Sequence, residues 1–179
     1  MIISDQQRAE NFQEYLLLRQ DPNYYDVTFD VESGGVSAIH VYHRFDKTLG
    51  PWGLRRGDYE RKVMDILRQN GHSIILEAET DELCKKSFDG IMDGLPCEIK
   101  TIEGTGRWAV RTKLVEAVKQ GAECLILFFP DYSLLSLPRI VEGWEMFDEA
   151  RLRNPTWRNL LQVLAVWSSG LIQIEKPPR

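Results

Sequence analysis

The spacing of hydrophobic and polar residues along the chain predicts a mixture of helices and strands. Helical spacing predicts helices at residues 5–19, 58–70, 106–120 and 144–153. Alternating or continuous apolar residues predict strands at residues 25–31, 36–43, 72–77, 87–92, 95–102, 125–129, 160–167 and 171–175. We therefore expect an α/β fold in which helices pack on a mixed central sheet.

The segment from residue 58 to residue 130 has the most regular pattern, with the order helix, three strands, helix, strand. Asp58 is the expected N-cap of its first helix. An apolar stripe follows on one face of that helix, formed by Tyr59, Val63, Ile66 and Leu67. The wholly apolar run at 125–129 is typical of a central strand.

A chain of 179 residues has the size of a single domain. We expect one domain over residues 1–179, with a core at 58–130. A helix and a hairpin at 1–57 precede this core, and an extension at 131–179 follows it. Apolar residues make up 43% of the chain, which is enough for a hydrophobic core and excludes global disorder.

The composition also restricts the location and the partners of the protein. The longest apolar run, 124–130, is too short to cross a bilayer, and no signal-peptide pattern is visible. Cys84, Cys97 and Cys124 form neither a paired set nor a zinc spacing, which favours a reducing compartment. We expect a cytoplasmic protein without membrane contact, and delivery by a larger system is compatible with this. The formal net charge of −5 argues against general coating of nucleic acid, but a local basic patch can still bind it.

Candidate chemistry is concentrated around the dipeptide Asp93-Gly94, which is a strong signal for a two-residue hairpin turn. Counting outward from such a turn places Asp89 opposite Glu98. Opposed Cβ atoms lie about 4.5–5.5 Å apart, and two like charges there destabilise a sheet unless a cation neutralises them. Lys100 shares the face of Glu98, because side chains alternate along a strand.

This arrangement predicts a site for a divalent metal ion. Carboxylate oxygens suit Mg²⁺, with Mn²⁺ or Zn²⁺ as alternatives, and Lys100 could orient an attacking water or stabilise charge on a phosphate. Glu60, near the start of the 58–70 helix, reaches the same cluster if that helix packs on the sheet. The structural alternative is a solvent-exposed acidic pair neutralised by the lysine, with Glu60 as ordinary surface charge near a helix N-terminus. Burial separates the two interpretations.

Glu60, Phe88-Asp89-Gly90 and Glu98-Ile99-Lys100 together resemble the motif of the PD-(D/E)XK nuclease superfamily. Phe88 stands where the proline of that motif would be. The resemblance covers residues 58–130. It is nearest to tRNase-like nuclease domains of bacterial contact-dependent growth-inhibition toxins and related phage or mobile-element proteins.

The resemblance implies a restriction-endonuclease-like αβββαβ core and a metal-dependent endonuclease. Asp89, Glu98 and Glu60 would bind the metal, and Lys100 would be the catalytic lysine. It also implies a nucleic-acid substrate, with RNA, especially tRNA, favoured over DNA. A toxin of this kind would have a cognate immunity protein that inhibits it.

A local excess of basic residues follows the hairpin and is the expected nucleic-acid-binding surface. Its candidate residues are Thr101, Arg107, Trp108, Arg111 and Lys113. Arg107 and Arg111 are four residues apart and would project from one helical face, while Trp108 offers a ring for base stacking. A solvated helix face is the alternative.

Two other functions remain open from the sequence. A metal-independent, barnase-like ribonuclease toxin would use a histidine as general base, and His40 and His43 are the candidates. A non-catalytic module on a nuclease scaffold would bind nucleic acid or a protein without turnover.

Overall fold

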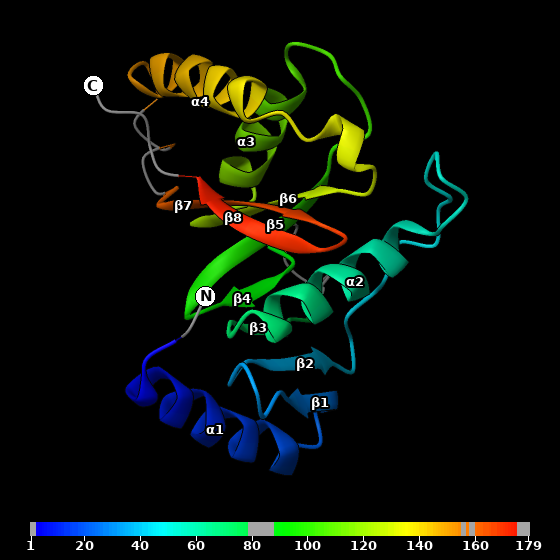
Figure 1. Ribbon diagram of the computed structural model, residues 1–179, viewed down its shortest axis with the longest axis vertical. Helices are drawn as coiled ribbons and strands as arrows, with labels where there is room; N and C mark the ends of the chain where they lie inside the picture. The colour runs from blue at the N-terminus through cyan, green and yellow to red at the C-terminus, as the bar shows by residue number, and fades with distance from the viewer. Residues whose placement is uncertain (1–2, 79–87, 155–156, 158–159, 175–179) are drawn as a thin grey trace. The chain divides into compact units, whose positions relative to one another are not determined.

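The computed structural model describes residues 3–78, 88–154, 157 and 160–174. Within these residues the chain contains four α-helices and eight strands, and α2, β3, β4, β5, α3 and β6 follow one another in the predicted order (Figure 1). The α/β fold class with mixed strand pairing is confirmed. The chain forms two compact units, unit 1 with Met1–Cys84 and Asp89–Leu95, and unit 2 with Lys85–Phe88 and Pro96–Arg179. The expectation that residues 1–179 act as one domain stays a prediction.

Unit 1 contains the helices α1 (Asp5–Gln20) and α2 (Arg56–Gln69) and the strands β1 (Tyr24–Phe29), β2 (Val36–His40), β3 (Ser73–Leu76) and β4 (Gly90–Met92). β2 pairs antiparallel with β1 and parallel with β3, and β3 pairs antiparallel with β4. Helices α1 and α2 cover opposite faces of these strands (Figure 1). Leu18 of α1 packs with Val36 and Ala38, whereas Ile39 lies on the other face with Met64 of α2.

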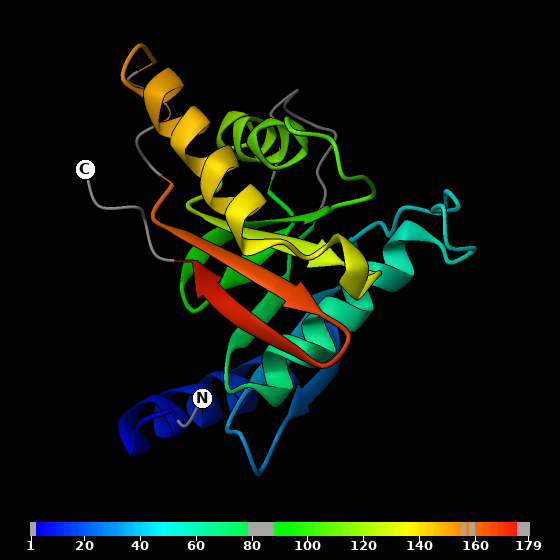
Figure 2. The ribbon, with the colours of Figure 1, turned by 45° about the horizontal axis from the view of Figure 1, so that its top comes forward.

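Unit 2 contains the strands β5 (Leu95–Thr101), β6 (Cys124–Phe129), β7 (Gln162–Trp167) and β8 (Gly170–Ile174), the helices α3 (Ala109–Lys119) and α4 (Leu137–Arg151), and a short 3₁₀ helix, η2 (Tyr132–Leu134). β6 lies between β5 and β7, parallel to both, and all six of its residues are buried, as predicted for a central strand. β7 and β8 form the predicted C-terminal hairpin. Helices α3 and α4 lie on the same side of these strands (Figure 2), and their apolar side chains pack with those of Leu125 and Leu127.

Three predicted helix starts are wrong. The N-cap of α2 is Arg55, not Asp58; Asp58 lies in the first turn, where its Oδ2 accepts a hydrogen bond from the Arg55 N–H at 3.1 Å. Helix α3 begins at Ala109, so Arg107 precedes it. Helix α4 begins at Leu137 because Pro138 occupies the first turn, where a proline is tolerated. The start of the strand predicted at 87–92 lies outside the described residues.

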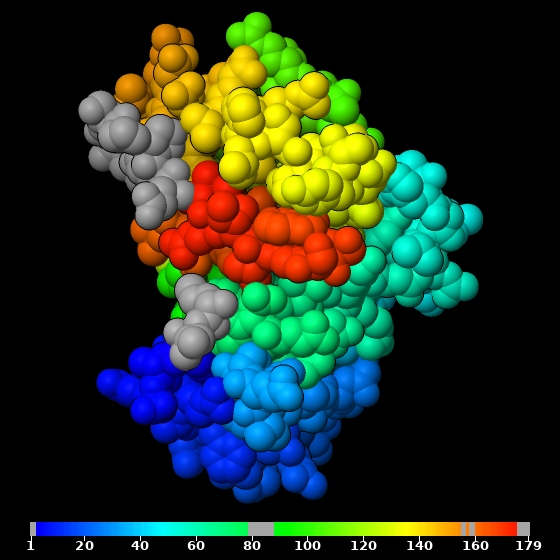
Figure 3. All heavy atoms as spheres, viewed as in Figure 1, coloured from blue at the N-terminus to red at the C-terminus, as the bar shows by residue number. Residues whose placement is uncertain are grey.

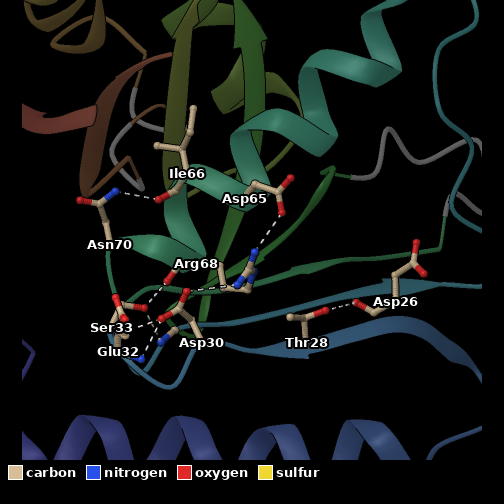
Figure 4. Close-up of polar contacts among 10 residues, drawn as sticks. Asp26, Thr28, Asp30, Glu32, Ser33, Asp65, Ile66, Arg68 and Asn70 are labelled. Atoms are coloured by element: carbon tan, nitrogen blue, oxygen red, sulfur yellow. Dashed lines mark hydrogen bonds and ion pairs between the residues drawn. The ribbon is translucent and has the colours of Figure 1, made fainter. Parts of the chain in front are cut away.

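Arg68 ties the C-terminal end of α2 to the β1–β2 turn (Figure 4). Its guanidinium lies 3.3 Å from Asp30 Oδ2 and 3.2 Å from Asp65 Oδ1. Its carbonyl oxygen accepts a hydrogen bond from Ser33 Oγ at 2.6 Å. The backbone N–H of Ser33 in turn donates to Asp30 and, as the main cause, lowers the pKa of that carboxyl below its usual value. The β1–β2 turn and α2 therefore form one polar junction.

In the described part of the chain, no helix combines the length and the apolar composition needed to cross a membrane.

Gly35 should be essential for this junction. A Cβ atom at Gly35 would lie 2.0 Å from the carbonyl oxygen of Arg68, which is backbone and cannot move aside. We expect Gly35→Ala to lower the free energy of unfolding by about 3 kcal/mol. Urea or thermal unfolding measures this effect. Gly104→Ala is the control, because no atom lies within 4 Å of a Cβ at that position; equal stability of the two variants would contradict the assignment.

Candidate active site

The turn at Asp93-Gly94 has the predicted geometry. Both residues have positive φ, 48° and 81°, as a type I′ hairpin turn requires. The Asp93 carboxylate fixes the turn to the start of β3, with Oδ2 2.6 Å from His72 Nδ1 and Oδ1 accepting the Ser73 N–H at 2.9 Å. The opposition of Asp89 and Glu98 that follows from this turn stays a prediction.

Glu98 and Lys100 form an ion pair on one face of β5. Glu98 is level with Leu125 and Lys100 with Leu127 of the neighbouring β6, and both leucines belong to the core under α3 and α4. The side chain of Glu98 is 0% exposed, and that of Lys100 is 20% exposed. The predicted shared face is therefore present within unit 2.

Burial gives this pair its chemical character. Removing a carboxylate from water carries a large free-energy penalty unless a cation and hydrogen bonds compensate it. Lys100 supplies the cation for Glu98. Glu98 lacks the exposure that the alternative of a solvated acidic pair requires, whereas Asp89 is half-buried.

Glu60 is held by a buried histidine. Its Oε2 lies 3.1 Å from Nε2 of His43, whose side chain is 0% exposed, compared with 18% for Glu60. The other ring nitrogen, Nδ1, lies 2.9 Å from the carbonyl oxygen of Glu77. A carbonyl only accepts, so Nδ1 donates to Glu77, and Nε2 faces the Glu60 carboxyl group. His43 thus fixes the position of the Glu60 carboxylate.

Glu77 connects Glu60 and Asp89, the two predicted metal ligands that lie in unit 1. Its carbonyl binds His43, the partner of Glu60, and its N–H donates to the carbonyl of Asp89 at 3.0 Å. Gly90 permits this close approach of β4 to β3, since a Cβ there would lie 2.2 Å from the Ile75 carbonyl oxygen. Glu60 and Asp89 are therefore anchored at the same end of the unit 1 strands.

The donor chemistry fits a hard cation held largely by water. The candidate ligands are carboxylates, and Mg²⁺ commonly binds proteins through one or two carboxylates while keeping several waters. Among the residues that the structure describes, no group of three or more His, Cys, Asp or Glu side chains is placed to hold a metal ion. The buried Cys97 and Cys124 are free thiols, and Cys84 lies outside the described residues.

Two further candidates, His40 and Thr101, lie at the ends of strands, and His43, the partner of Glu60, follows β2. His40 ends β2, and its Nδ1 accepts the Tyr42 N–H at 3.1 Å. His43 follows a turn after β2, with its N–H bonded to the His40 carbonyl. Thr101 ends β5 and alternates onto the face opposite to Lys100.

The predicted nucleic-acid-binding residues surround an exposed aromatic ring. Trp108 is the N-cap of α3 and is 55% exposed. The guanidinium carbons of Arg107 and Arg111 each lie 5.6 Å from the centre of its ring, so the two arginines meet at Trp108 although Arg107 precedes the helix. Arg107 also pairs with Glu142, and Lys113 pairs with Glu116 one turn later.

Sequence reasoning missed the role of Glu77 and did not identify His43 as the partner of Glu60. The short apolar run at 74–76 marks Glu77 as the end of a strand, but no periodicity reports which side chains meet there.

Comparison of the chain with protein-family models, with curated proteins and with solved structures finds no match.

Burial and the contact with the Glu77 carboxylate predict that Tyr24 titrates at a higher pH than an ordinary tyrosine. The Tyr24 hydroxyl donates to the Glu77 carboxylate at 3.2 and 3.3 Å, and burial, followed by the Glu77 charge, raises the pKa of Tyr24 from 10.0 to about 12. The fold favours the neutral phenol, so its stabilisation is present below pH 10 and is lost as the pH rises towards 12.

Absorbance of the tyrosinate should therefore show a late step that is missing in Tyr24→Phe and retained in Tyr25→Phe. A late step that survives Tyr24→Phe would contradict this assignment.

Proposed function

We propose that this protein is a metal-dependent nuclease that hydrolyses phosphodiester bonds of nucleic acid. The observation that carries the proposal is the fully buried Glu98 paired with Lys100 on one face of β5. A protein that keeps an ionisable pair in its interior retains it against a desolvation penalty, and such pairs are frequent at functional sites.

Each residue has a chemical role in this proposal. Asp89, Glu98 and Glu60 would hold the metal ion, as the resemblance implies, and His43 positions Glu60. A bound Mg²⁺ would lower the pKa of a water molecule and neutralise charge on the scissile phosphate. Lys100 donates hydrogen bonds that orient the attacking water and stabilise the negative charge that develops on the phosphate.

The substrate and the partners follow from the resemblance described above. RNA, in particular tRNA, is preferred over DNA, and the activity is that of a toxin with a cognate immunity protein. The exposed Trp108 with Arg107 and Arg111 supports nucleic-acid binding, because bases stack on aromatic rings and arginines bind phosphates.

A metal-independent ribonuclease requires a histidine that can exchange a proton with the substrate. Both ring nitrogens of His43 are engaged, by Glu77 and Glu60, and its side chain is 0% exposed. These contacts favour a positioning role for His43 over general-base catalysis. His40 stays the candidate base of the metal-independent alternative, which loss of chelator-resistant activity in His40→Ala would favour.

The direct test incubates the purified chain with tRNA, total RNA and plasmid DNA in Mg²⁺, Mn²⁺, Zn²⁺ or chelator. We expect cleavage with a divalent ion and none in chelator. Glu98→Gln and Asp89→Asn should each lower kcat about 100-fold or more, because each removes a metal-binding charge. The control is Glu145→Gln, at an exposed residue of unit 2, which should cleave as the wild type does.

Thermal unfolding of each variant separates loss of chemistry from loss of fold. Undiminished cleavage in chelator would establish the metal-independent ribonuclease instead. Binding of nucleic acid without cleavage under every condition would establish the non-catalytic module.

Retention of activity in chelator by a folded His43→Gln variant would in addition show that His43 is not the base. We expect His43→Gln to lower the Mg²⁺-dependent kcat and to raise the Mg²⁺ concentration needed for half-maximal activity about tenfold, because a residue that orients a ligand contributes to metal affinity. An unchanged Mg²⁺ dependence would contradict the positioning role.

A further inference from the structure

A basic pocket lies in unit 1 where the β2–α2 loop meets the first turns of α2. Its volume is about 500 Å³, within the range of ligand pockets. Its charged lining consists of four basic residues and two acidic ones: Arg44, Lys47, Arg55, Arg61, Asp46 and Asp58. The loop that carries most of them is the cyan projection at the surface in Figure 3.

Both acids in this pocket accept hydrogen bonds from the protein itself. Asp46 Oδ1 accepts from the N–H and from the hydroxyl of Thr48, each at 2.8 Å. Asp58 Oδ2 accepts from the Arg55 N–H at 3.1 Å. These acids shape the loop and the helix start. Lys47 and Arg55 are exposed lining residues, so their cationic groups can meet an anion in the pocket.

The pocket also has an aromatic wall. The ring of Phe45 meets the ring of His43 edge-on, with centres 4.7 Å apart, and the guanidinium carbon of Arg61 lies 4.1 Å from the Phe45 ring centre. Arg61 also reaches Asp26 at 3.2 Å. Exposed cations in the lining together with an aromatic ring match a ligand that has both a phosphate and an apolar part.

We propose that this pocket is a subsite for one nucleotide of the nucleic-acid strand, with its phosphate bound by Lys47 and Arg55. The proposal rests on the proposed function for the identity of the ligand. His43 links the pocket to the candidate active site, because it lines the pocket and holds Glu60. A nucleotide seated here would lie next to a residue that positions one of the proposed metal ligands.

The test measures binding without turnover. A short fluorescent single-stranded RNA is titrated with the full chain in chelator at several salt concentrations, and fluorescence anisotropy gives the Kd. We expect Lys47→Gln/Arg55→Gln to weaken binding about tenfold and to reduce the slope of log K against log salt by about 1.4, the value for two lost phosphate contacts on a single strand. Lys62→Gln/Lys119→Gln removes the same charge at exposed residues outside the pocket lining and should leave both quantities near those of the wild type.

Two further measurements separate this inference from the proposed function. Inorganic phosphate is used as a competitor, and we expect it to displace the RNA only weakly if the pocket binds a nucleotide and not a free phosphate. If phosphate displaced the RNA at a concentration comparable to that of the RNA nucleotides, the nucleotide assignment would be overturned. In cleavage assays with Mg²⁺, the pocket variant Lys47→Gln/Arg55→Gln should show a raised KM with little change in kcat.

Each outcome decides one of the two statements. Equal binding by the pocket variant and the wild type, or equal loss in the control variant, overturns the subsite, and cleavage by the wild type would then leave the nuclease proposal intact. Pocket-dependent binding by a wild type that cleaves nothing with any metal supports the subsite and overturns the nuclease. Absence of any RNA binding by the wild type overturns the subsite.

Discussion

The free-energy penalty for removing a carboxylate from water is the constraint on which the candidate site depends. Glu98 is completely buried on β5, and the ammonium group of Lys100 compensates its charge. A spacing of two residues places both side chains next to each other on one face of a strand. The leucines of β6 that lie level with them continue the same face into the core under α3 and α4. The ion pair therefore meets solvent mainly through the partly exposed Lys100.

Buried polar groups must also find partners in unit 1, and there Glu77, at the end of β3, supplies them. Glu77 extends the pairing of β3 with β4 by its N–H bond to the Asp89 carbonyl, and its own carbonyl holds the buried ring of His43. The other ring nitrogen of His43 meets the Glu60 carboxyl group, so both nitrogens have a partner. The backbone of Glu77 thus anchors Asp89, the residue before β4, and through His43 it anchors the side chain of Glu60. A nuclease site needs its acids held in this way, because ligands that move freely bind metal weakly.

The sequence was sufficient for the features that depend on local spacing. The apolar stripe of α2, the buried run of β6 and the Asp93-Gly94 turn all follow from periodicity or from turn chemistry, and so does the common face of Glu98 and Lys100. The contacts of Glu77 were not predictable, because a strand pattern gives the position of a backbone group but not the histidine from a distant loop that binds it. The spacing of Arg107 and Arg111 predicts that both lie on a helix, yet Arg107 meets Trp108 from the loop before that helix.

The start of α2 shows how such an error bears on function. An N-cap at Asp58 would leave Arg55, Arg56 and Gly57 in the loop. The helix instead includes Gly57, where a Cβ would lie 2.5 Å from the Cβ of Phe45, so that the loop folds back against the first turn. Asp58, one residue later, accepts the Arg55 N–H and fixes Arg55 as the N-cap. The three extra residues at the start of the helix and the returning loop bring Arg55, Phe45 and Lys47 to one pocket. A contact between residues twelve positions apart, from Phe45 to Gly57, therefore decides both where the helix begins and where the basic pocket forms.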